Sequence, residues 1–399
     1  MPFGAAEKFC REKVDKTKKA LYNDMRPESE GAPDGEGLKN SVLRARAVRA
    51  VSAFPFGPFP RGFFTRGDFM KKWLALVLTV FFAFSFAACN DEPAEKVTIQ
   101  YYSQASDMLP AMKAGQLATG LLPEPAATRI TTMNSAVSMK IDIQQVYGGD
   151  YPQAVLVAKK SVFENDSEFL SDLLTAMEKN AEWISENDGN AASAVDAINS
   201  ALAEGVTPSL SKDTINKAVV ENCNIYLQLA ADAKTSVNEY LEAMRGVDAD
   251  AASSVADGFF ATLPETTAAD ADVSYEIYMP DGAPALAMAQ LIKDDAQFGR
   301  TVNYTVVAAS NIGPAVVQKK ADVAILPVTA ASKIIGSGEE YVMLGVVTHG
   351  NIYVMSSEDL SSLQDLCGKT IGVIGQGQVP DLTFRYLLNK NGIEYQVAE

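Results

Sequence analysis

Polar residues suited to binding a small molecule follow most of the apolar runs in this chain. Side chains of Asn, Gln, Ser, Thr and His in short turns, together with free backbone N–H groups at helix starts, can bind a ligand through hydrogen bonds. Any one of them alone is more often a plain helix cap. Their shared position after strand candidates favours a binding site, because parallel strands end at one edge of a sheet. The candidate binding residues are Asp281, Gly282, Ser310, Asn311, Thr329, His349, Asn351, Gln376 and Gln378, with Glu124 in the first half.

These residues do not form a catalytic constellation. The sequence has one histidine, His349, and no Walker loop, nucleophile elbow or His–Asp pairing. His349 has two interpretations, a ligand contact or a cleft histidine with its own protein partners. Residues 375–380 begin like a dinucleotide loop but lack the third glycine and a downstream acidic residue, so we interpret them as a tight turn that presents amides to a ligand. We expect no catalytic residue, no cofactor and no enzymatic activity.

The cysteines do not indicate a metal site. Cys10, Cys89, Cys223 and Cys367 form no CxxC pair, and a single histidine makes a zinc site of mixed ligands improbable. Cys223 and Cys367 are either two buried thiols or a disulfide.

Alternating strand and helix patterns must position the candidate residues. β-rich runs at 273–279, 303–308, 322–326, 341–347, 352–356 and 370–374 are separated by helices of roughly ten residues, with further strands at 97–102, 139–146 and 154–159. Residues 166–244 are mostly helical and carry an apolar stripe at Phe169, Leu170, Leu173, Leu174 and Met177. This alternation predicts an α/β fold with a mostly parallel sheet and helices on both faces.

A targeting segment precedes these elements. Residues 70–89 contain Met70 and two lysines, an uncharged run of about 15 residues from Leu74 to Ala88, and then Cys89. The run is shorter than the roughly 20 apolar residues of a membrane-spanning helix. The whole segment 70–89 therefore predicts a signal peptide. Residues 1–69 show no helical or strand period, and we interpret them as a mis-called start or a disordered leader.

The charge distribution argues against nucleic acid as a partner. The formal net charge is −16, and residues 1–72 hold 15 Lys and Arg against 9 Asp and Glu, so residues 90–399 carry −22. A body this acidic has no surplus of basic side chains to neutralise phosphates.

Several motifs resemble a known family. Residues 279–285 (MPDGAPA), 321–327 (ADVAILP) and 368–373 (GKTIGV) resemble the type II periplasmic-binding-protein fold, and more narrowly the ABC-transporter substrate-binding proteins of the sulfonate, nitrate and thiamine-precursor type. Phe86-Ala87-Ala88-Cys89 resembles a bacterial lipobox, with Phe86 in place of the usual aliphatic residue. The resemblance covers roughly 96–399. It implies two α/β lobes with a ligand cleft between them, joined by crossover strands and closing about a hinge, and it implies lipidation at Cys89.

The order of the segments differs from that family. Residues 273–399 match its first half, with the strands of lobe 1, the crossover and the start of lobe 2, whereas 96–260 match its second half, with part of lobe 2 and a helical return to lobe 1. We expect a circularly permuted chain in which residues 248–272 form a linker between the old ends, and a linker of this length spans short distances easily. A misassembled or rearranged gene is the alternative.

The resemblance implies the extracytoplasmic substrate-binding component of an ABC importer, held at the cell membrane by a lipid anchor. Its expected partners are a small molecule and the permease subunits, and we expect a monomer. Two alternatives use the same fold: an enzyme similar to pyrimidine-precursor synthases, although their Cys-rich cluster is missing here, and a ligand-sensing lipoprotein.

The basic residues bear on the charge of the ligand. Lys319, Lys320 and Arg385 fall on helices, on faces expected to be solvated, so no Arg clamp for a strong anion is evident. This favours a neutral or cationic heterocycle or amine, with Tyr278 and Tyr353 as stacking candidates.

Overall fold

Two six-stranded mixed sheets form the described part of the chain. The structure is a computed structural model that describes residues 95–263, 266–269 and 272–398. Two compact units, Met1–Cys89 and Asn90–Glu399, divide the chain, and all described residues belong to the second. The predicted leader 1–69, the signal peptide 70–89 and the lipidation site Cys89 lie outside the described residues.

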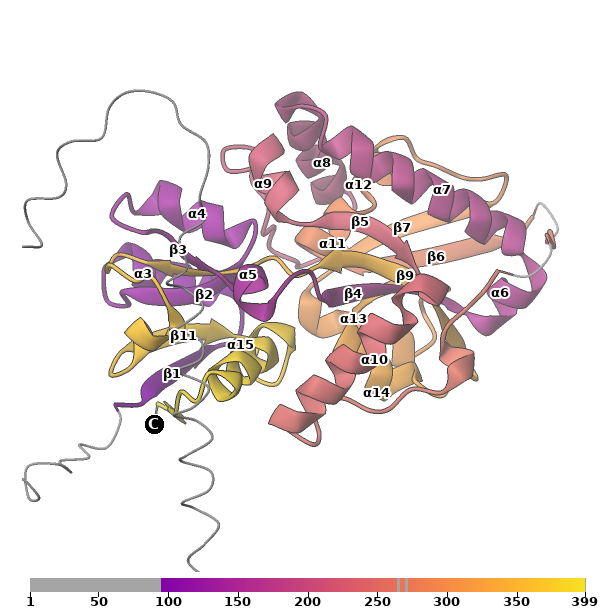
Figure 1. Ribbon diagram of the computed structural model, residues 1–399. Coiled ribbons are helices and arrows are strands. Elements are labelled where there is room, and N and C mark those ends of the chain that lie inside the picture. The colour runs from indigo at the N-terminus through magenta and orange to yellow at the C-terminus, as the bar shows by residue number, and fades with distance from the viewer. Residues whose placement is uncertain (1–94, 264–265, 270–271, 399) are drawn as a thin grey trace, which may run out of the picture. The chain divides into compact units, whose positions relative to one another are not determined.

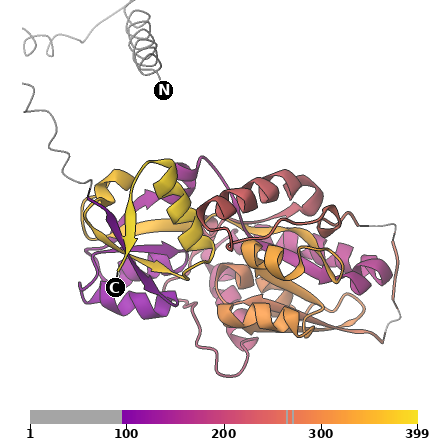
Figure 2. The same ribbon diagram turned by 90° about the horizontal axis from the view of Figure 1, so that it is seen from below.

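Sheet A combines strands from both ends of the chain in the order β12-β1-β11-β2-β10-β3. β12, β1, β11 and β2 run parallel, whereas β10 is antiparallel to both of its neighbours. Figure 2 shows β12, at the yellow end of the chain, beside the indigo β1. The strands are β1 (Val97–Tyr102), β2 (Thr119–Pro123), β3 (Ser138–Asp142), β10 (Ile352–Ser356), β11 (Thr370–Ile374) and β12 (Tyr395–Val397), and the accompanying helices are α3 (Ala105–Lys113), α4 (Ala126–Met133), α5 (Ile143–Tyr147), α15 (Val379–Lys390) and the 3-10 helix η2 (Leu363–Leu366).

Sheet B has the order β5-β9-β4-β8-β6-β7. β6, β7 and β8 are parallel, β4 is antiparallel to β8 and β9, and β5 is antiparallel to β9. Its strands are β4 (Pro152–Lys159), β5 (Ile225–Leu229), β6 (Ser274–Pro280), β7 (Thr301–Val307), β8 (Val323–Pro327) and β9 (Tyr341–His349), and its helices are α6 (Lys160–Asn165), α7 (Ser167–Ile184), α8 (Asp188–Ser200), α9 (Lys217–Asn222), α10 (Ala230–Val247), α11 (Ala283–Leu286), α12 (Ala289–Lys293), α13 (Ala309–Val317), α14 (Val328–Ile335) and the 3-10 helix η1 (Asp257–Phe259).

The two sheets share one arrangement. In sheet B, the strands β6, β7, β8 and β9 follow one another in the sequence. They lie in the spatial order β7-β6-β8-β9, with the antiparallel β4 between β8 and β9. Sheet A repeats this arrangement as β1-β11-β2-β10-β3, with β10 in the antiparallel position. The match requires β11 to count as the first strand of sheet A, although β11 follows β1, β2 and β3 in the sequence.

Helices cover both faces of each sheet (Figure 1), so the central strands are buried on both faces. In β4, Val155 and Val157 point to one hydrophobic cluster and Ala154 and Leu156 to another. The first cluster extends under α10, α13, α14 and α15 and is continuous across the two sheets, the second lies under α7, α8, α11 and α12, and a third lies under α3 and α4. The predicted α/β fold is therefore confirmed, with two sheets in two lobes.

Several local predictions need correction. The strand expected at 139–146 ends at Asp142, because the Asp142 carboxylate accepts the backbone N–H groups of Gln144 and Gln145 and starts α5. The helical region 166–244 contains the strand β5. Of the two alternatives for Cys223 and Cys367, the structure has the free thiols, buried at Cys223 and half-buried at Cys367.

The expectation that Arg385 lies on a solvated helix face is wrong. Its guanidinium pairs with Asp381, whose side chain is fully buried, through two hydrogen bonds of 3.0 Å. Asp381 in turn accepts the hydroxyl of Tyr101 from β1, so this pair joins α15 to sheet A.

The segment 248–272 packs against sheet B where it is described. Phe259 is fully buried, and Ala261 donates its backbone N–H to the carbonyl of Met343 in β9. Farther along, Thr267 and Ser167 exchange hydrogen bonds. The role of this segment as a linker between old chain ends stays a prediction.

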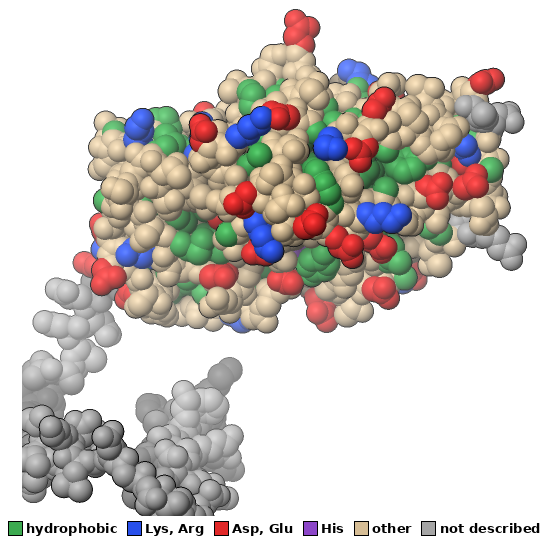
Figure 3. Space-filling model, turned by 90° about the horizontal axis from the view of Figure 1, so that it is seen from above, with side chains coloured by type: hydrophobic (Ala, Val, Ile, Leu, Met, Phe, Trp, Pro, Cys, Tyr) green, Lys and Arg blue, Asp and Glu red, His purple; other side chains and the backbone are tan. Residues whose placement is uncertain are grey.

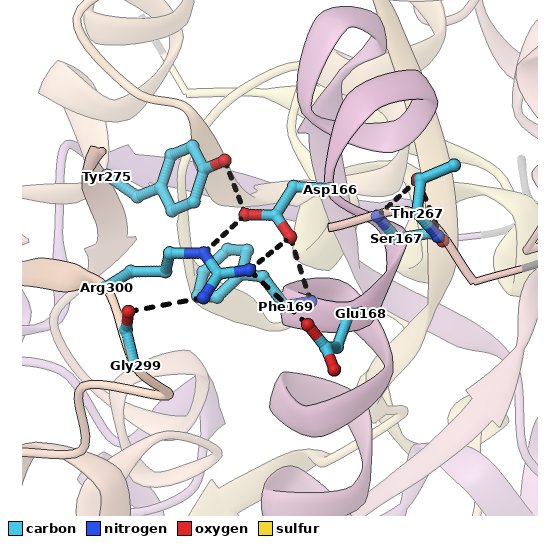
Figure 4. A network of polar contacts seen from close by, with 8 residues as sticks. All are labelled: Asp166, Ser167, Glu168, Phe169, Thr267, Tyr275, Gly299 and Arg300. Atoms are coloured by element: carbon cyan, nitrogen blue, oxygen red, sulfur yellow. Dashed lines mark hydrogen bonds and ion pairs between the residues drawn. The ribbon is translucent and has the colours of Figure 1, made fainter. Parts of the chain in front are cut away.

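A buried ion pair holds the amino-terminal edge of sheet B (Figure 4). Asp166, which is fully buried, accepts two hydrogen bonds from Arg300 at 2.8 and 2.9 Å and one from the hydroxyl of Tyr275 at 2.8 Å. Burial alone would raise the pKa of Asp166, but these hydrogen bonds lower it below its ordinary value. This network lies where β6 and β7 begin, at the edge of sheet B opposite to the one where these strands end.

Candidate functional site

The carboxyl ends of the parallel strands in both sheets meet at two crossovers. β6, β7, β8 and β9 end at one edge of sheet B, and β1, β2, β3 and β11 end at one edge of sheet A. The chain passes from the end of β9 to the start of β10 through Gly350 and Asn351 alone, and from the end of β3 to the start of β4 through residues 143–151. Three residue steps span at most about 11 Å, so the two carboxyl edges lie close together at the first crossover.

The structure places every candidate binding residue at one of these two edges. Asp281 and Gly282 follow β6, Ser310 and Asn311 open α13 after β7, Thr329 opens α14 after β8, and His349 and Asn351 lie at the end of β9 and in the crossover. On sheet A, Glu124 follows β2, and Gln376 and Gln378 follow β11.

Exposure divides these residues into an exposed and a buried group, with Asp281 and Gly282 half-buried between them. Ser310, Asn311, Gln376 and Gln378 are exposed, in the turns that open α13 and α15. The buried members, at no more than 4% exposure, are Glu124, Thr329, His349 and Asn351. The buried side chains therefore have defined protein neighbours, and these neighbours determine their chemistry.

Glu124 has a structural task at the start of α4. Its carboxylate oxygens accept the backbone N–H of Thr128 at 2.9 Å and the Thr128 hydroxyl at 2.8 Å. Burial raises the pKa of Glu124, and these hydrogen bonds oppose the rise. Its carboxylate thus caps α4.

Asp281 keeps one carboxylate oxygen without a partner. Its Oδ2 accepts the backbone N–H of Ser209 at 2.6 Å, while Oδ1 is buried and has no hydrogen-bond partner. Burial raises the pKa of Asp281. The carbonyl of Ser209 accepts Arg129 Nη1, from α4, at 3.4 Å, so the loop carrying Ser209 bridges the two edges.

His349 lies in a second group at the crossover. Its ring stacks on Tyr226 of β5, and neither Nδ1 nor Nε2 has a partner although both are buried. Burial lowers the pKa of His349 to about 4, against the opposing charge of Asp150. The hydroxyl of Tyr226 donates to Asp150 at 3.1 Å.

Asn351 is fully buried beside it. Its Nδ2 donates to the carbonyl of Cys223 at 3.4 Å, and its Oδ1 is buried without a partner. Tyr353, a stacking candidate, is buried in the cluster under α3 and α4, and its hydroxyl donates to the carbonyl of Asn222. Tyr226, which the sequence did not single out, is the aromatic residue that stacks at this site.

Sequence reasoning also missed Arg129, Asp150, Ser209 and Asn224. Asn224, with φ +53°, donates its side-chain amide to Asp150 and to the carbonyl of Gly350. The turn Gly148-Gly149-Asp150 before Tyr151 and Pro152 was the available signal for Asp150, since such a cluster marks a chain reversal. No strand pattern pointed to Ser209 or Asn224.

Two surface depressions of the described chain lie away from this site. One is bounded by residues around Lys160, Lys319 and Glu340, and the other by residues 389 and 392–395. On the face shown in Figure 3, acidic and basic side chains are interspersed. Within the described ranges, no helix is long and apolar enough to cross a membrane, and no group of His, Cys, Asp and Glu is arranged to hold a metal ion.

Comparison with known proteins gives only distant structural likenesses. No family model and no curated protein matches the sequence. The chain is similar to the oligopeptide-binding protein AppA of Bacillus subtilis in complex with a nonapeptide, at 10% identity and TM-score 0.26, over 64% of this chain and 54% of that one. It is also similar to a substrate-binding protein from Microbacterium hydrocarbonoxydans complexed with 4-hydroxybenzoate hydrazide, at 12% identity and TM-score 0.24, over 70% of this chain and 56% of that one. The chain thus spans little more than half the length of either structure, and at these TM-scores the likeness does not extend to function.

Proposed function

We propose that this chain is the extracytoplasmic substrate-binding component of an ABC importer, which captures a small molecule between its two lobes and delivers it to the permease. One observation supports this proposal above the others: the carboxyl-end edges of two similarly ordered sheets meet across two crossovers, and polar side chains collect there. Ligands of open α/β sheets bind at such edges.

The crossovers provide the hinge that this function needs. The direct connection through Gly350 and Asn351 is short, and the longer one contains α5. A ligand that contacts residues of both edges would favour the closed arrangement by its difference in affinity for the two states. No catalytic role is required of any residue in this scheme.

The proposed location rests on the sequence of residues 70–89. A lipid on Cys89 would hold the binding unit at the outer face of the cell membrane, next to the permease. Metabolic labelling with a fatty acid tests this point: the chain should incorporate label, and Cys89→Ser should abolish it. Equal labelling of the two proteins would remove the anchor from the proposal.

We further propose that the chain is circularly permuted relative to the sulfonate, nitrate and thiamine-precursor type of binding protein. Sheet A supports this, because its strands follow the order of sheet B only when β11 is counted before β1. Strands from the two ends of the chain pair directly, for example Ile99 with Ile371.

Small-angle scattering and thermal unfolding of the full chain test the binding function. A panel of sulfonates, oxyanions, amines, amides, pyrimidines and short peptides should contain at least one compound that reduces the radius of gyration and raises the unfolding temperature without being consumed. An unchanged scattering profile and unfolding temperature across the panel would refute the proposed function.

A further inference from the structure

The buried polar atoms that lack a partner are concentrated at one edge of sheet B. Among the described residues, five side-chain atoms are buried with no hydrogen-bond partner: Gln153 Oε1, Asp281 Oδ1, His349 Nδ1, His349 Nε2 and Asn351 Oδ1. All four residues lie where the parallel strands of sheet B end or where β4 begins. The rest of the described chain, including the Asp166–Arg300 network, has no such atom.

This concentration points to an occupant. A buried polar group without a partner destabilises the fold, and such groups in folded proteins are normally satisfied by protein, water or ligand. His349 and Asn351 are 2% and 0% exposed, so bulk solvent does not satisfy them. A molecule bound at this edge, water or ligand, would satisfy these atoms.

The strand order gives the extent of the site. His349 lies opposite Pro152, the residue before Gln153, so these side chains come from neighbouring strands. Asp281 follows β6, which is separated from β4 by β8 alone. With strands about 4.8 Å apart, the edge from β9 to β6 measures about 15 Å, so a ligand that reaches both Asp281 and Asn351 must carry polar groups at both of its ends.

Hydrogen-bond acceptors predominate among those unpartnered atoms whose role as donor or acceptor is fixed. Asp281 Oδ1 is a carboxylate oxygen, and Asn351 Oδ1 is an acceptor because the Nδ2 of the same amide donates to Cys223. A neutral His349 offers one donor and one acceptor. Arg129, the cation that approaches this edge, already donates to the Ser209 carbonyl.

We infer that the ligand is a neutral or cationic hydrogen-bond donor, such as an amine, amide or amidine, which donates to Asp281 Oδ1 and Asn351 Oδ1. This inference rests on the proposed function and specifies its substrate class. The carboxylate of Asp281 attracts a cation and repels an anion, and the stacked imidazole of His349 supplies a further donor and acceptor beside Asn351.

Two series of probes with matched shape and different charge test the inference. Hexane-1,6-diammonium, adipamide and adipate, which carry polar groups at both ends, and likewise benzamidinium, benzamide and benzoate, are added to the full chain at constant ionic strength, and the dissociation constant is derived from the rise in unfolding temperature. In at least one series the cation should bind most tightly, the amide more weakly and the anion not at all.

Two variants assign the contacts. Asp281→Asn should weaken cation binding about tenfold or more while the amide changes little, and Asn351→Leu should weaken both by about tenfold. The exposed Asp232→Asn and Asn238→Leu are the matched controls and should bind as the parent chain does.

The outcomes separate this inference from the proposed function. If an anion binds most tightly, if the two variants bind as the parent does, or if no probe binds, the inference is wrong, and in the last case water alone occupies the edge. Each of these results leaves the proposed function in place as long as some compound of the broader panel still closes the lobes. If no compound closes the lobes, the proposed function itself fails.

Discussion

The imidazole of His349 lies flat against the ring of Tyr226, with centroids 3.6 Å apart and planes 3° from parallel. The two residues come from the adjacent strands β9 and β5, and Asp150 is hydrogen-bonded to the Tyr226 hydroxyl. The stack covers one face of the only histidine in the sequence and leaves its two nitrogens at the ring edge.

His349 should make stability depend on pH. Because the folded protein lowers the pKa of His349 from 6.5 to about 4, the unfolded chain binds the proton first as the pH falls. The free energy of unfolding should therefore decrease from about pH 6.5 to about pH 4, by on the order of 3 kcal/mol from this residue. Denaturant unfolding measures this as the difference between the parent chain and His349→Gln over that pH range.

A direct titration checks the cause. Since His349 is the only histidine, its ring protons give isolated NMR signals in the folded chain. A folded-state pKa near 6.5, or a pH dependence that is identical in the parent and in His349→Gln, would contradict the prediction.

The buried ion pair should stabilise the fold without affecting ligand binding. Asp166→Asn leaves the guanidinium of Arg300, whose side chain is 9% exposed, with only the half-exposed Glu168 at 3.5 Å as a charge partner, and this should cost about 3–5 kcal/mol of unfolding free energy. Asp257→Asn is the matched control, because Asp257 is exposed in its pair with Lys234 and should cost less than about 1 kcal/mol. Probe affinity should stay unchanged in Asp166→Asn, since the pair lies at the opposite edge of sheet B.

The hydrogen bond between Tyr240 and Thr383 should couple α10 to α15. Their hydroxyl oxygens are 2.7 Å apart, and both side chains are fully buried. Either Tyr240→Phe or Thr383→Val leaves a buried hydroxyl unpaired and should cost about 1–3 kcal/mol. The double variant should cost less than the sum of the two, and strict additivity in chemical unfolding would mean that the bond does not link the helices.

Any side chain at position 350 in place of Gly350 should destabilise the fold. A Cβ at this position would lie 2.3 Å from Cε1 of the Tyr151 ring, which is itself buried, so Gly350→Ala should cost about 1–3 kcal/mol through overpacking. Tyr151→Leu should restore part of that loss in the double variant. Gly246→Ala is the control, because a Cβ there meets no atom within 4 Å, and it should be neutral or stabilising by up to about 1 kcal/mol. Equal unfolding temperatures for the two glycine variants would contradict the prediction.

Much of the fold could be predicted because its strands are local and apolar on both faces. The run from Val273 onward gave β6 to β11 close to their observed bounds, and the stripe from Phe169 to Met177 is buried in α7 as expected. β5 was missed because its five residues are only partly buried and lie within a helical region. Its importance comes from pairing with β9, which sequence periodicity does not reveal.

The sequence by itself determined the α/β class and the placement of polar residues after strand ends, because both follow from local periodicity and turn chemistry. Only the tertiary structure decided which of those residues matter together. It brought Asp150, Tyr226 and His349 into one group from three distant segments, buried Asn351 beside Cys223, and used the Glu124 carboxylate to cap α4. The physical reason is that burial and the absence of a hydrogen-bond partner depend on the packing of strands and crossovers from both ends of the chain.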